Sequence, residues 1–268
     1  MPHSDEYDSS AIARANARAW DAEVAKGHWA TVPLTDDEFR DAARDGFPVS
    51  VTGSRPVPAS WLGDLAGQRV LCIACGSGQQ TVLLAGRGAT VTSLENSAQQ
   101  LQRDIDTCAK FGLELSAVEG SMDDLHSLSA SAFDIVVLGM GAQFVADLRP
   151  VFAHIRRILT ADGFFIGGFV NPVCYVFDWK AQADNKLEVR HKVPYSDLTS
   201  CPRTNGALCS GETLRWSSGI ALKRSSVACQ PRASVSTATS KSSTHVNRWA
   251  NIFRAFSPCV PAKRRADP

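Results

Sequence analysis

The sequence predicts an α/β protein with a doubly wound, mainly parallel sheet and an N-terminal helical segment. Short apolar runs such as VLCIA at 70–74 and FDIVVL at 133–138 are typical of strands that are buried on both faces. Helix-forming segments separate these runs, and strands that alternate with helices at this spacing indicate a parallel sheet. The first run leads directly into a tight turn at Gly76 and Gly78, and that turn opens the next helical pattern.

The residues before this region are expected to be helical. Apolar positions near a 3.6-residue spacing predict a helix over residues 9–26. Thr35 and Glu38 form a capping box, which predicts a short helix that stops at Gly46.

From Gln68 onward, strand and helix patterns alternate for about a hundred residues. Ser97 and Gln100 form a second capping box, and Gly112 is the expected stop of the helix that it opens. The expected strands are 70–74, 89–94, 113–118, 133–138 and 164–170, and the expected helices begin at 79, 97 and 147.

The composition is ordinary for a globular protein: 268 residues, 44% hydrophobic and 21% charged, with a net charge of +1. This balance argues against a dedicated binder of nucleic acid or membrane surfaces. The sequence has no apolar run of about 18 residues that would span a membrane, and its start lacks the features of a signal peptide. We therefore expect a cytoplasmic protein with reduced thiols, and no residue pattern indicates an oligomeric state.

Cys72 and Cys75 form a C-x-x-C, the spacing of a redox pair. A redox pair needs accessible sulfurs at a helix N-terminus. Because Cys72 lies inside an apolar run, we interpret both as small buried residues.

The glycine turn predicts a ligand site. In a doubly wound sheet, ligands bind at the carboxyl ends of the strands, where the strand order reverses. Glu95 closes the second strand, nineteen residues beyond Gly76, and an acid there can accept the hydrogens of two ribose hydroxyls. A dinucleotide fingerprint would have a third glycine where Thr81 stands. This favours a ligand with a ribose but without phosphates, and disfavours an NAD(P)-dependent oxidoreductase.

The motifs VLCIACGSGQQ, VTSLENS, EGSMDDL, FDIVVL and RILTADGFFIGGF follow one another over residues 66–170. In this order they resemble the class I S-adenosylmethionine-dependent methyltransferases, which have a Rossmann-like fold. The stretches PVPASW, GFVNPVCYVFD and LEVRHKVPYSDLTS look like a bacterial branch that acts on small molecules. The resemblance implies S-adenosyl-L-methionine as cofactor and a small-molecule methyl acceptor.

The resemblance also implies roles for single residues. The glycine turn would pass under the methionine and ribose, Glu95 would hold the ribose hydroxyls, and Met122 would lie against the adenine. Asp123 and Asp124 would lie near the adenine amino group, or would only cap the following turn. The expected cofactor-binding residues are Ala74, Cys75, Gly76, Gly78, Gln79, Glu95, Asn96, Met122, Asp123 and Gly139.

Three positions depart from the family pattern. Cys72 stands where an acid is common, Ala74 replaces the usual first glycine, and Ser121 replaces the Asp of a G-D-M pattern. Loss of one charge-assisted hydrogen bond at position 121 would cost about 1.5–3 kcal/mol if nothing compensates.

The substrate side is less defined. Trp20, His28 and Trp29 either form a lid over the substrate or simply pack the N-terminal helix. Together with Trp20 and His28, we expect Gln143, Phe144 and Tyr175 to contact the substrate. Asp178 is a further candidate. No catalytic residue and no metal site stands out; if the acceptor is a hydroxyl or thiol, His28 or His191 is the candidate base, whereas His154 is a packing or surface residue.

The chain divides into an N-terminal helical lid segment (1–64), a cofactor-binding core (65–200) and a tail (201–268). After Ser200 the resemblance stops, and the tail contains eleven Lys and Arg residues against Glu212 and Asp267. It shows no sustained apolar alternation, so we expect the C-terminal strands of the fold to be missing or aberrant.

We favour a frameshift near codon 200 as the origin of the tail. The alternative is a natural disordered, basic extension that could bind an anionic partner such as RNA. The chain is then either an active methyltransferase or a non-catalytic remnant that binds the cofactor.

The tail gives a first prediction. If a frameshift produced it, the DNA read in another frame after codon 200 encodes an acid-balanced segment with two strand-like runs. Restoring that segment raises thermal stability and cofactor affinity together, whereas deleting residues 201–268 from this chain changes the free energy of unfolding little. A deletion that unfolds the protein, or the lack of any open alternative frame, would contradict this interpretation.

Overall fold

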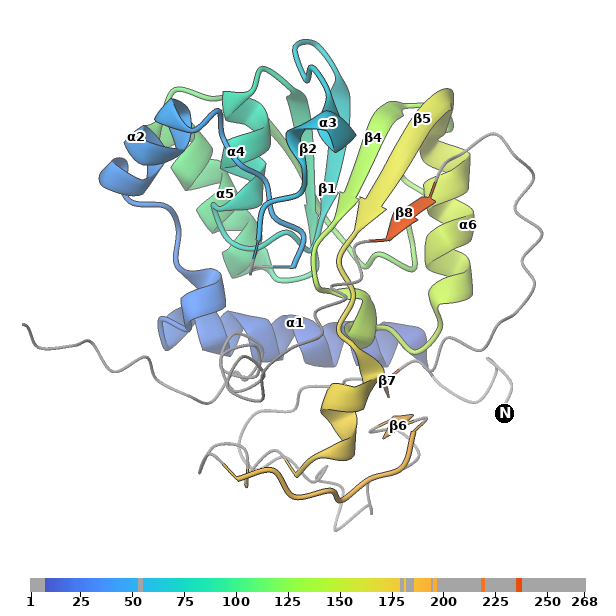
Figure 1. Cartoon of the computed structure of the whole chain (residues 1–268). Coiled ribbons are helices and arrows are strands. Elements are labelled where there is room, and N and C mark those ends of the chain that lie inside the picture. The colour runs from blue at the N-terminus through green and yellow to red at the C-terminus, as the bar shows by residue number, and fades with distance from the viewer. Residues whose placement is uncertain are drawn as a thin grey trace, which may run out of the picture.

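The structure is a computed structural model of the chain, with a helical N-terminal part and an α/β core (Figure 1). The residues that it describes are 8–52, 55–178, 181, 186–193 and 195–196, together with the backbone of 218–219 and 235–237.

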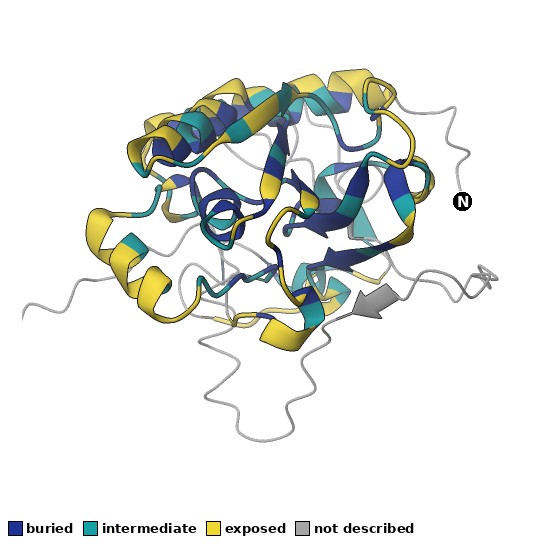
Figure 2. Ribbon diagram, turned by 90° about the horizontal axis from the view of Figure 1, so that it is seen from above, coloured by how far each residue is buried: buried dark blue, intermediate teal, exposed yellow. Residues whose placement is uncertain are grey.

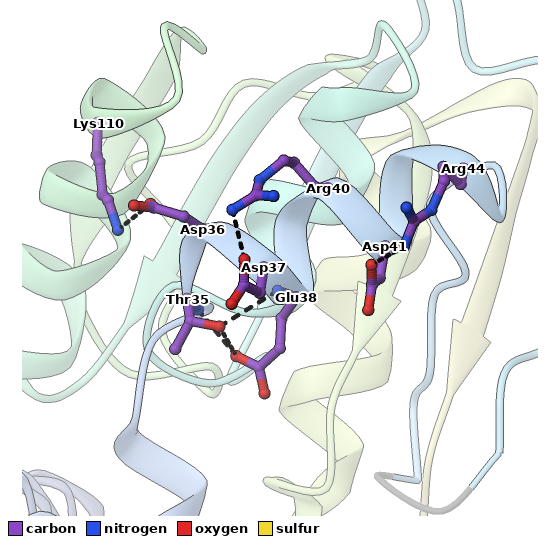
Figure 3. Close-up of polar contacts among 8 residues, drawn as sticks. All are labelled: Thr35, Asp36, Asp37, Glu38, Arg40, Asp41, Arg44 and Lys110. Atoms are coloured by element: carbon purple, nitrogen blue, oxygen red, sulfur yellow. Dashed lines mark hydrogen bonds and ion pairs between the residues drawn. The ribbon is translucent and has the colours of Figure 1, made fainter.

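The N-terminal helices form where the sequence predicts them. Helix α1 spans Ser9–Ala25 and is capped by the Asp8 carboxylate, which accepts a hydrogen bond from the Ala11 N–H. A 3-10 turn, η2, covers Trp29–Thr31, and α2 spans Asp36–Arg44. Both bonds of the predicted capping box between Thr35 and Glu38 are present (Figure 3).

Helix α2 lies on the surface and none of its residues is buried (Figure 2). Its ion pairs, including Asp36 with Lys110 at 2.5 Å, are exposed and contribute little to stability (Figure 3). The Phe39 ring stacks on Phe111 with centroids 3.9 Å apart. This ring contact and the Asp36–Lys110 pair join α2 to the end of α5 (Ala98–Lys110).

The core sheet has the order β3-β2-β1-β4-β5-β8, and all of its strand pairs are parallel. The order reverses between β1 and β4, which confirms the predicted doubly wound sheet. The remaining core elements are β1 (Arg69–Ile73), α4 (Gln80–Gly86), β2 (Thr90–Glu95), β3 (Leu115–Glu119), β4 (Phe133–Leu138), η3 (Ala142–Phe144), α6 (Leu148–Ile158), β5 (Leu159–Gly167) and η4 (Pro172–Val176), with a short α3 (Ala59–Leu62) before β1.

The side chains of β1 alternate between two apolar clusters, one on each face of the sheet. Val70 and Cys72 pack with Leu84 of α4 on one face. Leu71 and Ile73 pack on the other face, in the cluster that contains Val151 and Ile155 of α6. All four β1 side chains are at most 1% exposed, and burial of each aliphatic one contributes about 1.5–3 kcal/mol. This explains why β1 is apolar at four consecutive positions, 70–73, rather than at alternate ones.

Strand β5 begins earlier than predicted. The expected strand starts at Phe164, but β5 starts at Leu159, which pairs with Phe133. The register then shifts, so that Ile135 pairs with Phe164. Residues 160–163 (TADG) lie at this irregularity, and because their sequence is typical of a turn it did not predict a strand.

After residue 196, the described part of the chain contributes two short strands. β7 (Ser218–Gly219) pairs antiparallel with β6 (Tyr195–Ser196), and β8 (Val235–Thr237) pairs parallel with β5. The sequence predicts no strand-like run in this region. The rest of the expected tail segment lies outside the described residues, so its origin stays a prediction.

Among the described helices, none combines the length and the apolarity needed to cross a membrane.

Gly168 gives a second prediction, because a Cβ there would overlap the Val51 carbonyl group. We expect Gly168→Ala to lower the free energy of unfolding by at least about 2 kcal/mol, since the obstacle is backbone that cannot rotate away. Gly120→Ala is the matched control, because nothing lies within 4 Å of a Cβ at that position, and it should stay within about 0.5 kcal/mol of the wild type. Urea unfolding measures both; equal effects of the two substitutions would contradict the close approach of Val51 to the end of β5.

Candidate active site

The glycine turn after β1 is built from left-handed backbone. Gly76 has φ +89° and Gly78 has φ +68°, and Ala74 has φ +48°. Only glycine adopts such angles without cost, so Ala74 carries about 1–2 kcal/mol of strain. The turn therefore keeps the shape of a glycine-rich loop although its first glycine is replaced.

Glu95 ends β2 beside this turn and is 4% exposed. Its Oε1 atom is buried and has no hydrogen-bond partner. The backbone N–H groups of Gly76 and Cys75 face the carboxyl group and favour its ionised form. Burial outweighs them and, with the nearby charge of Asp104, raises the pKa of Glu95 to about 8. A buried carboxyl oxygen without a donor is rare in a folded protein and needs an explanation.

Asp104 of α5 is a second buried carboxyl group, which the sequence analysis missed. Its side chain is 0% exposed and accepts three hydrogen bonds. The donors are the Gly78 N–H at 2.5 Å, the Thr81 hydroxyl at 2.8 Å and the Ser93 hydroxyl at 2.6 Å. Burial raises the pKa of Asp104 to about 6, and these hydrogen bonds oppose the rise.

The second predicted capping box forms only in half. Ser97 accepts a hydrogen bond from the Gln100 N–H at 3.2 Å. The Gln100 side chain instead accepts a hydrogen bond from Ser77 in the glycine turn, at 3.2 Å. Gln100 is 7% exposed, so its amide is used to bind the turn to α5 rather than to close the helix end.

Two of the expected cofactor residues bind the N-terminal segment. The Gln79 amide donates to the Val32 carbonyl at 2.8 Å, and the Asn96 amide donates to the Ala13 carbonyl at 2.7 Å. Their contribution to ligand binding stays a prediction.

The other expected cofactor residues lie around the same edge of the sheet. Met122 is 8% exposed, and its methyl group lies near Gly141. Ser121 donates to the Asp123 carboxylate at 2.5 Å, so the serine that replaces an acid still makes a polar contact in this loop. Asp124 accepts from the His126 N–H at 3.4 Å, which agrees with the alternative of a turn cap. The backbone packing explains the glycine at position 139, because a Cβ there would overlap the Ala74 carbonyl.

The C-x-x-C cysteines are buried, as the sequence predicts. Cys72 is 1% and Cys75 is 6% exposed, and both are free thiols. Burial raises the pKa of the Cys72 thiol, which keeps it protonated. A redox role is therefore not supported. The part of the chain that the structure describes has no cluster of three potential metal ligands.

Helix α1 runs across the carboxyl edge of the sheet (Figure 1). Besides the Asn96 contact, Asn16 of α1 donates to the Phe144 carbonyl at 2.7 Å. Asp21 accepts from the Ser97 hydroxyl at 2.5 Å and from the Gln99 N–H at 3.2 Å. The helix thus bridges the loop after β2 and the loop after β4, which lie on the two sides of the switch point.

The substrate-side candidates fall into two aromatic groups. Trp20 contacts Phe144 edge-on with centroids 5.5 Å apart, and contacts His28 at 6.2 Å. These half-buried rings come from α1, η3 and the turn after α1. The Gln143 amide donates to the Met140 carbonyl at 2.6 Å.

The second group lies on the segment after β5. Tyr175 stacks with Tyr195 at 6.1 Å, and His191 contacts Tyr195 at 4.6 Å. Asp178 forms an ion pair with Arg190 and caps Ala181, which gives it a structural role. His154 is 9% exposed and its ring packs edge-on against His126, so the expected packing role is confirmed.

Comparison with known proteins places the site in context. Residues 71–167 match the methyltransferase domain family. The chain is 37% identical over 194 residues to an uncharacterized methyltransferase of Bacillus subtilis, and the match covers 72% of this chain and 76% of the relative. An uncharacterized methyltransferase of Synechocystis is 34% identical over 102 residues, which are 37% of this chain and 45% of the relative. A solved S-adenosylmethionine-dependent methyltransferase of Mesorhizobium loti aligns with 22% identity and a TM-score of 0.39, over 44% of this chain and 54% of that one.

The buried Glu95 gives a third prediction. Its pKa is raised from 4.5 to about 8 in the folded protein, so between these values the folded state holds more protons than the unfolded state, and stability falls as pH rises through this window. Glu95→Gln has no charge to bury. We expect it to be more stable than the wild type by roughly 1–3 kcal/mol at pH 8 and about equal at pH 5.

Urea unfolding of the ligand-free protein at the two pH values measures this difference. Glu119→Gln is the control, since Glu119 occupies the paired position on β3 and is exposed. A Glu95→Gln protein that is less stable than the wild type at pH 8 would show that the carboxylate is well solvated or paired.

Proposed function

Because this chain belongs to the class I S-adenosylmethionine-dependent methyltransferases, we propose that it transfers a methyl group from S-adenosyl-L-methionine to a small-molecule acceptor. S-adenosyl-L-methionine is the cofactor of this family. The acceptor class and the roles of single residues are our proposal, which the following observations support.

The observation that carries the proposal is the unpartnered carboxyl oxygen of Glu95. A buried polar atom without a hydrogen bond costs about 1–3 kcal/mol, and the cost is higher for a charged group. The hydroxyls of a ribose are donors that would remove this cost. Glu95 lies at the carboxyl end of β2, next to the switch point between β1 and β4 where ligands of this fold class bind.

The surroundings of Glu95 fit a ribose ligand without phosphates. A pyrophosphate is held by backbone N–H groups at the start of the helix after the glycine turn. Here Asp104 already accepts the Gly78 N–H and the Thr81 hydroxyl at that position. The negative charge of Asp104 would repel a phosphate group. This charge is a stronger physical argument against NAD(P) than the lack of a glycine at position 81. S-adenosyl-L-methionine has a ribose and no phosphate.

The cofactor supplies the electrophilic methyl group, and the protein needs to orient the reactants and exclude water. We assign the acceptor side to Trp20, His28, Gln143 and Phe144. The rings of Trp20, His28 and Phe144 gather where α1 meets the loop after β4, and Gln143 precedes Phe144 in that loop. The apolar faces of Trp20 and Phe144 would exclude water from the transfer. His28 is the candidate base for a hydroxyl or thiol acceptor. Tyr175 and His191 belong to the second aromatic group and are weaker candidates.

Measurements of cofactor binding and of methyl transfer distinguish an active enzyme from a non-catalytic remnant that only binds the cofactor. A remnant would bind S-adenosylhomocysteine and leave a radiolabelled methyl group on the cofactor in every acceptor pool tested. The enzyme would move the label to one class of acceptor.

Glu95 gives a fourth prediction, which concerns cofactor affinity. Calorimetry should show that S-adenosylhomocysteine binds and NADH does not. Glu95→Ala should weaken that binding at least about ten-fold, or by 1.4 kcal/mol, because it removes both acceptors of the ribose hydroxyls. Glu119→Ala, at the paired position of β3, should leave the dissociation constant unchanged. Binding of NADH alone would refute the proposed function, and an unchanged constant for a folded Glu95→Ala protein would place the ribose elsewhere.

A further inference from the structure

Asp104 connects three elements that the cofactor site depends on. Its Oδ1 atom accepts from the Gly78 N–H of the turn and from Thr81 of α4, and its Oδ2 atom accepts from Ser93 of β2. These partners are 26, 23 and 11 residues away in the sequence. One side chain thus fixes the turn that follows β1 against the strand that carries Glu95.

The environment of Asp104 is built for an acceptor. All three printed partners donate a hydrogen to the carboxylate, and in the described part of the chain no lysine or arginine forms an ion pair with it. Burying a carboxyl group without a cation is costly. The buried face of α5 also carries Leu101 and Cys108, and an aliphatic side chain at position 104 would be buried beside them without that cost. The polar group therefore has a task beyond filling space.

The packing around the turn shows how tightly this task is constrained. A Cβ at Gly78 would overlap the Thr107 side chain of α5 and come within 3.0 Å of Pro33. The turn thus packs closely between α5 and the N-terminal segment. Hydrogen bonds to neighbouring groups fix the directions of its N–H groups. Asp104 takes the Gly78 N–H, and this leaves the preceding N–H groups of Cys75 and Gly76 directed at Glu95.

On the basis of the proposed function, we propose that Asp104 is a positioning residue for the cofactor: its carboxylate fixes the glycine turn against β2, and its charge acts on the ribose-binding Glu95. It does not touch the cofactor. It sets where the turn and the ribose acceptor stand relative to each other, and how readily Glu95 ionises.

The electrostatic part follows from the buried groups that share this region. The titratable groups that sense the charge of Asp104 are Glu95, Cys72 and Cys108. Burial raises the pKa of the thiol of Cys108 to about 12, and that of Cys72 is raised in the same way, so both stay neutral. Glu95 is the only one of the three that titrates near neutral pH, where its pKa is about 8. Removing the charge of Asp104 would lower that pKa.

This coupling fixes the sign of a pH effect. A carboxylate accepts two ribose hydroxyls better than a carboxylic acid does, so affinity should rise with pH until Glu95 is ionised. In the wild type the affinity should level off only above pH 8, because the pKa of Glu95 is about 8. With Asp104→Asn the amide oxygen can still accept from Gly78 and Thr81, and the amide NH₂ can donate to Ser93. The turn should keep its place, and the midpoint of the pH profile should move downward.

The experiment measures the dissociation constant of S-adenosylhomocysteine by calorimetry from pH 6 to 9.5 for four folded proteins. Relative to the wild type, Asp104→Ala should bind at least ten-fold more weakly at pH 9, whereas Asp104→Asn should stay within three-fold there. The Asn variant should also show a midpoint at least half a pH unit lower. Ser93→Ala removes the bond that joins this carboxylate to β2 but leaves its bonds to Gly78 and Thr81, so it should weaken binding less than Asp104→Ala does, by about three- to ten-fold.

The outcomes separate the two claims. If the wild type binds no S-adenosylhomocysteine at any pH, the proposed function fails and the inference fails with it. If the wild type binds and folded Asp104→Ala binds equally well, the residue is structural only and the inference alone is overturned. If Asp104→Ala does not fold, the Asn variant decides, and an unchanged midpoint overturns the inference.

Discussion

Three hydrogen bonds to Asp104 hold the turn after β1, the start of α4 and the middle of β2 in one arrangement. The turn has further contacts: the Ala74 N–H donates to the Leu94 carbonyl, Ser77 donates to Gln100, and the Gly78 carbonyl accepts from the Leu34 N–H. The left-handed backbone at Ala74, Gly76 and Gly78 carries strain at its first residue, and such strain persists only where the surroundings determine it. The site rests on this buried carboxylate, although the carboxylate is not where a ligand would bind.

Glu95 shows the other side of the same arrangement. A carboxyl group that is 4% exposed, with an unpartnered oxygen and a pKa of about 8, lowers the stability of the ligand-free protein. The burial of the apolar side chains in the surrounding sheet offsets this loss of stability. In the proposed function, the stability given up at Glu95 is recovered when a ribose supplies the missing donors. In this proposal the two acids have opposite roles: the protein itself donates to Asp104, and the ligand donates to Glu95.

The order of the core elements could be predicted because β1 and β4 are almost entirely apolar and the turns have their own signals. Val70–Ile73 and Phe133–Leu138 are buried on both faces, and Gly112 follows the end of α5 with φ +68°. The start of β5 could not be predicted, because Leu159 is followed by the turn-like sequence TADG at an irregularity of the strand. Gln100 was misassigned for a similar reason: a capping-box pattern is local, but its amide found a better partner in the turn, 23 residues away.

The places of Gly76, Gly78 and Glu95 were predictable, because backbone conformation and a strand end define them. Their role in binding stays a prediction. Asp104 was missed although a signal exists. It lies three residues after Leu101 and four before Cys108, both buried, so it is an acid on the apolar face of its helix. Its partners, however, come from three separate segments, and only the fold brings them together. The contacts of Asn16 and Asn96 across α1 are of the same kind, since no local pattern links a helix before the core to the loops that it bridges.

The central claim is that the protein keeps Glu95 protonated at neutral pH until a ribose-bearing ligand reaches it. Carbon-13 NMR of the side-chain carboxyl groups, assigned with Glu95→Gln, measures this directly in the ligand-free protein and with S-adenosylhomocysteine. The account predicts a pKa near 8 without ligand and a fall of at least one unit with it, because the ligand favours the ionised form. A Glu95 pKa near the ordinary 4.5 in the ligand-free protein, unchanged by the ligand, would contradict it.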